Sequence, residues 1–266
     1  MKYSEKDLAR HHGDILKGIE NLSQEYQNRD FKGLENFLSK PNLFKTITDC
    51  ICGTPQNPAR TSGYNRGSHH RHITEKAIEK ALQEFYDGHY VYKRCKDFPL
   101  SDVIPDTLRK LNSTADFEEL IREVYSILEG VDGIGPTVKY DFSYSFGNWL
   151  HARKPILPEV NVYVHTKPLN TVILLEKVGV LDRKSRNIIE YKVEKGKKLH
   201  YGGFYIPLIK FPDEFLGSVR LRRAVHLENF LCHYNEEIIM LVAGYFPDIL
   251  TKAQREIVKH LKNKNL

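Results

Sequence analysis

The segment Val131-Asp132-Gly133-Ile134-Gly135-Pro136-Thr137 has the residue types of a turn that binds phosphate. Two glycines around Ile134 allow a tight turn and let the backbone approach a ligand closely. Pro136 suits the first turn of a following helix, whose free N–H groups and positive dipole end can bind a phosphate oxygen. Such a contact positions DNA without reading its sequence. The alternative interpretation is an ordinary glycine-containing connection between two packed helices.

Helical spacing on both sides of this turn favours the DNA-binding interpretation. Apolar residues from Phe117 to Leu128 follow the period of an amphipathic helix, and residues 137–149 read as a second helix. Ile134 would then lie between the two helices and fix their angle. The residues expected to contact the DNA backbone here are Gly133, Ile134, Gly135, Thr137 and Lys139.

The remaining elements place this hairpin in a mostly α protein with a small β-hairpin insertion. Helical periodicity covers residues 5–38, 74–88 and 101–111, and helices return from about residue 221. Residues 188–193 and 204–209 read as two strands joined through residues 194–198. We expect a helical region over 1–180. A β-hairpin segment with C-terminal helices follows over 181–266, packed into the same globule.

Three stretches of the chain resemble the helix-hairpin-helix DNA glycosylase superfamily. Leu43 to Gln56 is similar to an early helix that runs into a polar loop, and Leu128 to Gly147 is similar to the hairpin and its exit. Residues 155–162 are similar to the segment that delivers the catalytic carboxylate. The resemblance spans roughly residues 30–180. It implies a glycosylase-like fold that binds double-stranded DNA carrying a damaged or modified base.

The resemblance also implies which carboxylate takes part in the reaction. Breaking the N-glycosidic bond builds positive charge on the sugar, which an ionised carboxylate can stabilise while it orients water. Glu159 stands where the family has Asp, with a longer gap from the hairpin, and Asp141 is the second candidate. The alternative for Glu159 is a solvated charge at a strand end, because Val160, Val162 and Val164 alternate with polar positions.

A departure from the family pattern bears on strand cleavage. Members with lyase activity carry Lys just after the hairpin glycine, whereas this chain has Thr137 there and Lys139 two residues further on. The resemblance therefore implies base removal to an abasic site without lyase activity.

The polar stretch 54–72 is long for a loop inside a compact domain, which suggests a functional role. Arg66 and Arg71 could bind phosphates, and Gln56 or Tyr64 could fill the gap left by a flipped base. A solvated loop is the alternative. His69, His70 and His72 also lie here, but no carboxylate or Cys follows at ligand spacing, so we expect neither a metal nor a cofactor.

The positive net charge of the chain is compatible with binding to a polyanion such as DNA. The 266 residues carry a net charge of +6, and basic residues gather over 183–198 and 220–223. No apolar run could span a bilayer and the start lacks a signal peptide, so a cytoplasmic location, or a nuclear one in a eukaryote, is expected. The cysteines at 50, 52, 95 and 232 are interpreted as structural.

Three functions remain open at the level of sequence. The first is a DNA glycosylase of repair or antiviral defence that extrudes its target base. The second is a non-catalytic helix-hairpin-helix DNA-binding protein of a repair or defence assembly. The third is a nuclease that binds DNA through the hairpin and uses the histidines at 69–72. The identity of the base is not determined by the sequence.

Overall fold

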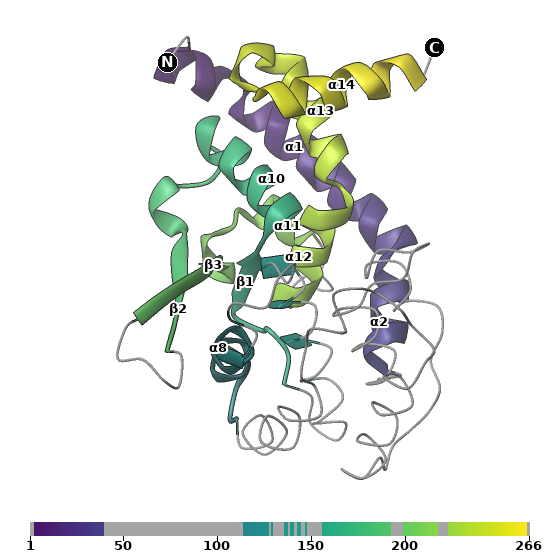
Figure 1. Cartoon of the computed structure of the whole chain (residues 1–266). Coiled ribbons are helices and arrows are strands. Elements are labelled where there is room, and N and C mark those ends of the chain that lie inside the picture. The colour runs from purple at the N-terminus through teal and green to yellow at the C-terminus, as the bar shows by residue number, and fades with distance from the viewer. Residues whose placement is uncertain are drawn as a thin grey trace. The chain divides into compact units, whose positions relative to one another are not determined.

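The computed structural model describes residues 3–39, 114–127, 129, 136–137, 139–140, 143–144, 147, 156–192, 199–217 and 223–264. These residues are mostly helical and include one small three-stranded antiparallel sheet (Figure 1). The prediction of a mostly α protein with a small β element is confirmed. The glycosylase-like arrangement remains a prediction.

The chain divides into two units, each assembled from segments that are distant in the sequence. Unit 1 comprises Met1–Lys32, Glu159–Ile188 and Gly203–Leu266, and unit 2 comprises Gly33–Pro158 and Ile189–Gly202. The sequence boundary near residue 180 therefore falls inside unit 1.

Unit 1 begins with the long helix α1 (Glu5–Arg29), whose start is fixed by Ser4. The Ser4 hydroxyl accepts from the Asp7 amide at 3.2 Å, and the Asp7 carboxylate accepts from the Ser4 amide at 2.9 Å. This capping box satisfies two N–H groups that have no partner within a helix. Ile15, Ile19 and Tyr26 lie on one face and are fully buried. After Asp30 the chain continues as α2 (Phe31–Ser39), so the predicted helical region 5–38 is confirmed as two helices.

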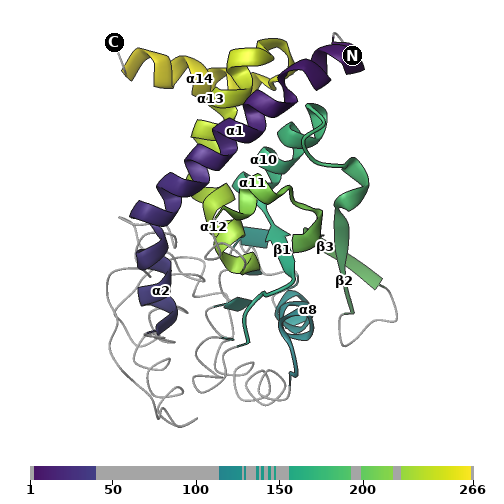
Figure 2. The same cartoon turned by 180° about the vertical axis from the view of Figure 1, so that it is seen from behind.

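Among its described residues, unit 1 has five further helices: α10 (Thr166–Lys177), α11 (Asp213–Leu216), α12 (Ala224–His233), α13 (Asn235–Tyr245) and α14 (Lys252–Lys264). Short 3-10 turns lie at Arg183–Ser185, Leu208–Lys210 and Pro247–Ile249. Helix α1 packs on α11 and α13, and α10 packs on α12 and α13. Figures 1 and 2 show α13 and α14 at the same end of unit 1 as the N-terminal part of α1. There the Tyr3 ring meets the ring of Phe246, which follows α13, edge-on.

The sheet contains β1 (Asn161–Val164), β2 (Asn187–Lys192) and β3 (Leu199–Pro207) in the order β1-β3-β2. Strands β2 and β3 confirm the predicted β-hairpin, although β3 begins five residues earlier than predicted. In β1, Asn161 lies opposite Pro207 and Val164 opposite Phe204.

The expected in-and-out alternation of β1 is wrong. Val162, Tyr163 and Val164 are all buried, His165 is buried after them, and Val160 is 71% exposed. The physical reason is that α10 and α12 both pack against this short strand, so neither side of it faces solvent. His165 precedes α10 and places its Nε2 2.9 Å from the Glu228 carboxylate of α12.

Unit 2 contains α8 (Phe117–Ile127), which confirms the predicted helix before the glycine turn. The Asp116 carboxylate accepts from the Glu119 amide at 2.9 Å and so caps the first turn. Phe117, Leu120, Ile121 and Val124 form the buried face of α8. These positions match the apolar periodicity of the sequence.

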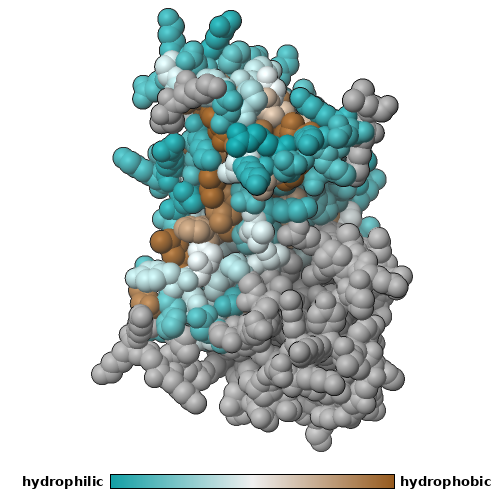
Figure 3. All heavy atoms as spheres, turned by 45° about the horizontal axis from the view of Figure 1, so that its top comes forward, coloured by the Kyte–Doolittle hydropathy of each residue, from teal (hydrophilic) through white to brown (hydrophobic). Residues whose placement is uncertain are grey.

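The described surface is mostly hydrophilic on the face shown in Figure 3, with a band of hydrophobic atoms crossing it. Large hydrophobic side chains stand exposed at Val160, Ile188, Tyr201 and Ile209 among the described residues. Within that same part of the chain, no helix has the length and apolar character needed to cross a membrane.

Candidate nucleic-acid interface

The second helical segment of the predicted hairpin follows Pro136. Every described residue from 136 to 147 is helical, and Pro136 itself is exposed at the start of the segment. Tyr140 meets the Phe117 ring of α8 edge-on at 6.2 Å between centroids. The structure thus has helical residues on both sides of the glycine turn, packed against each other. The turn residues Val131 to Gly135 lie outside the described residues.

Gly147, near the end of this helical segment, lies very close to Ile156 and Leu120. Its carbonyl oxygen accepts from the Ile156 amide at 3.3 Å. A Cβ at this position would overlap the Ile156 carbonyl oxygen and approach the Leu120 side chain within 2.8 Å. Residue 147 must therefore lack a side chain, which gives a packing reason for the small residue at the exit of the hairpin.

An ion pair joins the two sides of the turn. The Lys139 ammonium lies 3.2 Å from the Glu129 carboxylate, across the sequence that contains both glycines. The Lys139 side chain is only 9% exposed, and its ammonium lies over the Tyr125 ring at 4.8 Å from the centroid. A cation over the face of a tyrosine ring is attracted by the ring electrons. Lys139 is thus held inside the helix pair.

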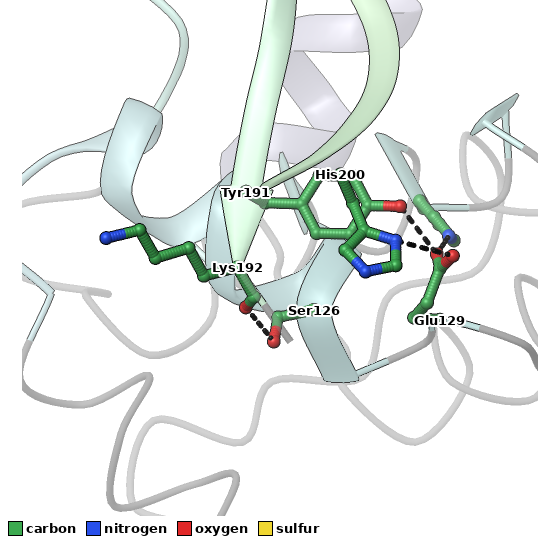
Figure 4. Close-up of polar contacts among 6 residues, drawn as sticks. Ser126, Glu129, Tyr191, Lys192 and His200 are labelled. Atoms are coloured by element: carbon green, nitrogen blue, oxygen red, sulfur yellow. Dashed lines mark hydrogen bonds and ion pairs between the residues drawn. The ribbon is translucent and has the colours of Figure 1, made fainter. Parts of the chain in front are cut away.

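Glu129 is the centre of a cluster that also includes two residues of the β-hairpin (Figure 4). The Tyr191 hydroxyl donates to Glu129 Oε2 at 2.6 Å, and His200 Nδ1 lies 3.5 Å from Oε1. The hydrogen bond from Tyr191 lowers the pKa of Glu129, and Lys139 and His200 act in the same direction. Burial and the neighbouring carboxylate raise the pKa of Tyr191. Glu129 is therefore a stabilised carboxylate at neutral pH.

Two more contacts attach the β-hairpin to α8. The Ser126 hydroxyl donates to the Lys192 carbonyl oxygen at 2.7 Å. Gly202 lies against the Tyr125 ring so closely that a Cβ would overlap ring carbons. We use the name β arm for residues 189–192 and 199–202, the part of the β-hairpin that belongs to unit 2. The β arm and the helical hairpin are thus parts of one unit.

The residues predicted to bind DNA fall into two groups. Thr137 is half-buried, and Lys139 is buried in its pair with Glu129. The others lie outside the described residues and stay predictions: Gly133, Ile134, Gly135, Gln56, Tyr64, Arg66 and Arg71.

The structure describes one of the two candidate catalytic carboxylates. Glu159 is exposed on a bend that precedes β1, and it belongs to unit 1, whereas the hairpin belongs to unit 2. Asp141 lies outside the described residues. An exposed carboxylate before a strand also matches the alternative interpretation of Glu159 as a solvated charge.

The sequence does not single out the residues of the Glu129 cluster. Glu129 had one available signal, since it is an acidic residue directly before the glycine turn and ten residues from Lys139. Tyr191 and His200 had none, because Tyr191 is 62 residues from Glu129 in the chain. The helix α10 is also not predicted, although Pro168 suits its first turn.

Among the described residues, no group of three or more His, Cys, Asp or Glu side chains is arranged to hold a metal ion. The comparisons with protein-family models, curated proteins and solved structures found no match.

Proposed function

We propose that this protein is a DNA glycosylase that removes a damaged or modified base and leaves an abasic site. One observation carries the proposal. Helical residues flank the Gly133-Ile134-Gly135 sequence on both sides, and the Glu129–Lys139 pair links the two sides of the turn. The turn that the sequence predicts between these helices would present its N–H groups to a DNA phosphate.

The chemistry would begin when the target nucleotide is extruded from the base stack. Cleavage of the N-glycosidic bond leaves positive charge on the sugar, and a nearby carboxylate stabilises that charge and orients water. Glu159 is the proposed carboxylate, with Asp141 as the second candidate. Exposed Glu159 would need to be covered by bound DNA to act in a low-dielectric environment.

Strand cleavage is not part of the proposal. A lyase reaction needs an uncharged lysine amine that attacks the sugar carbon and forms a Schiff base. The Lys139 ammonium is ion-paired to Glu129 and is enclosed by the Tyr125 and Tyr191 rings. Lys139 is therefore engaged by a carboxylate and two rings within the protein, which supports a reaction that ends at the abasic site.

The decisive experiment measures abasic-site formation on DNA duplexes that each carry one damaged or modified base. The wild-type protein is compared with Glu159→Gln, and Gly135→Ala is the variant that tests DNA binding by the hairpin turn. We expect Glu159→Gln to form no abasic product, unlike the wild type. We expect the wild type to bind DNA in a salt-sensitive way and Gly135→Ala to bind it more weakly. Product from Glu159→Gln at the wild-type rate would contradict the role of Glu159.

A non-catalytic DNA-binding protein is the second candidate, and the exposure of Glu159 is the observation that favours it. A carboxylate surrounded by water stabilises a developing positive charge much less than an enclosed one. Salt-sensitive DNA binding without product on any duplex, and without change in Glu159→Gln, would select this second function.

A further inference from the structure

We infer that the outer face of the β arm is a second DNA-binding element, which takes up an unpaired nucleotide beside the DNA held by the hairpin turn. The element consists of Tyr201 as a stacking platform and Lys192 as a phosphate contact. This inference rests on the proposed function and deepens it, since it names where part of the DNA strand lies.

The first step is that the β arm has two distinct faces. Side chains alternate along a strand, so residues two apart share a face. Tyr191, His200 and Gly202 face α8, where they contact Glu129 and the Tyr125 ring. Lys192 and Tyr201 therefore face the other way, and Figure 4 shows the Lys192 side chain pointing away from the Glu129 cluster.

The second step concerns what this outer face exposes. Tyr201 is 63% exposed, and it is one of few large hydrophobic side chains so exposed among the described residues. Lys192 and Glu190 are exposed on the same face of β2. An exposed aromatic ring can stack on a base, and the exposed Lys192 on the same face of the arm can contact a phosphate.

The third step is that the β arm is attached to the residues that flank the predicted turn. The Ser126–Lys192 hydrogen bond and the Tyr191–Glu129 hydrogen bond join the β arm to α8 and to the residue before the glycine turn. Glu129 is also the partner of Lys139 on the far side of that turn. The β arm is therefore linked to residues on both flanks of the predicted turn, and it belongs to the same unit as those residues.

The experiment measures fluorescence polarisation of two labelled DNA duplexes, one with a single unpaired adenine and one fully paired. Binding is followed over a range of salt concentrations for Tyr201→Ala, Tyr201→Phe and Lys192→Gln. Ile209→Ala and Lys210→Gln are matched controls, since both residues are exposed and belong to unit 1. Gly135→Ala measures the contribution of the predicted hairpin turn to DNA binding in the same assay.

We expect Tyr201→Ala to weaken binding of the duplex with the unpaired adenine by roughly tenfold, because one base–aromatic stack is lost. Binding of the paired duplex should change much less, and Tyr201→Phe should bind both duplexes like the wild type. Lys192→Gln should lower the slope of log K against log salt by about one, as expected for one phosphate contact. The two controls should match the wild type.

Two results separate failure of the inference from failure of the proposed function. If Gly135→Ala loses binding while Tyr201→Ala and Lys192→Gln bind both duplexes like the wild type, the β arm does not contact DNA. DNA binding by the hairpin turn is then still supported. If the wild type binds neither duplex, the proposed function fails and the inference fails with it. Self-association that Tyr201→Ala abolishes, with DNA binding unchanged, would assign the outer face to a second copy of the chain.

Discussion

At the scale of single residues, Lys139 shows how one side chain can be read in two ways. Its position after the glycine turn suggests a phosphate contact, whereas the structure places its ammonium between Glu129 and two tyrosine rings. Removing one partner of a buried ion pair leaves an uncompensated charge. The other partner, Glu129, is partly exposed, which moderates this cost because water can solvate it.

The variant Lys139→Met should therefore lower the free energy of unfolding by about 2 kcal/mol. Urea denaturation followed by circular dichroism measures this, and Lys210→Met at an exposed position is the control, with an expected change below about 0.5 kcal/mol. If Lys139→Met is as stable as the wild type but binds DNA less tightly, then Lys139 acts as a DNA contact instead.

The pKa of Glu129 gives a second prediction at this scale. Its pKa is lowered in the folded protein, mainly by the hydrogen bond from Tyr191. A lowered carboxylate pKa contributes stability that is present at neutral pH and lost as the pH falls below about 5. Tyr191→Phe removes the main cause, so the loss of unfolding free energy between pH 7 and pH 4 should be smaller in this variant.

Denaturation of both proteins at the two pH values provides the test, with Tyr201→Phe as the matched control for removal of a tyrosine hydroxyl from an exposed ring. An acid-induced loss that is equal in Tyr191→Phe and the wild type would mean that the hydrogen bond from Tyr191 does not hold Glu129 ionised.

At the scale of secondary-structure elements, the packing of the hairpin's second segment depends on Gly147. Alanine favours helix over glycine by up to about 1 kcal/mol. At position 147, however, the new methyl group would overlap the Ile156 carbonyl oxygen, and backbone cannot move as easily as a side chain. We expect Gly147→Ala to destabilise the protein by about 1–3 kcal/mol.

Gly13→Ala in α1 is the control for Gly147→Ala, because a Cβ at Gly13 meets no atom within 4 Å. It should raise the free energy of unfolding by about 0.5–1 kcal/mol, since alanine restricts the unfolded chain and favours helix. Thermal or urea denaturation of both variants tests the pair. Stabilisation by both substitutions would show that the contact between residue 147 and Ile156 is not close.

At the scale of the whole molecule, the proposed DNA binding must appear as added stability. A ligand that binds only the folded state at 100 times its Kd raises the free energy of unfolding by about 2.7 kcal/mol. We expect a paired DNA duplex to raise the Tm of the wild type and to shift Gly135→Ala much less. This shift does not require that the base substrate be known. A wild-type Tm unchanged by DNA would argue against both the glycosylase and the non-catalytic DNA-binding protein.

The sequence by itself determined the local features of this protein. The periodicity from Phe117 to Leu128 predicted α8, the spacing of Ile15, Ile19 and their neighbours predicted the first helices, and the strand-forming residues around 188–209 predicted the β-hairpin. Each of these depends on residues close together in the chain, where backbone preference and side-chain period act directly. The break at Asp30 and the helix α10 were not predicted, because their apolar patterns give no clear boundary.

The tertiary structure alone decided which distant residues meet. Only the folded chain brings Tyr191 and His200 to Glu129, and only packing by α10 and α12 buries both sides of β1. In unit 2 the folded chain pairs Lys139, which is also a predicted DNA contact, with Glu129. Sequence spacing carries no signal for such contacts. They form where buried polar groups need partners, and the approach of whole elements determines which partners are within reach.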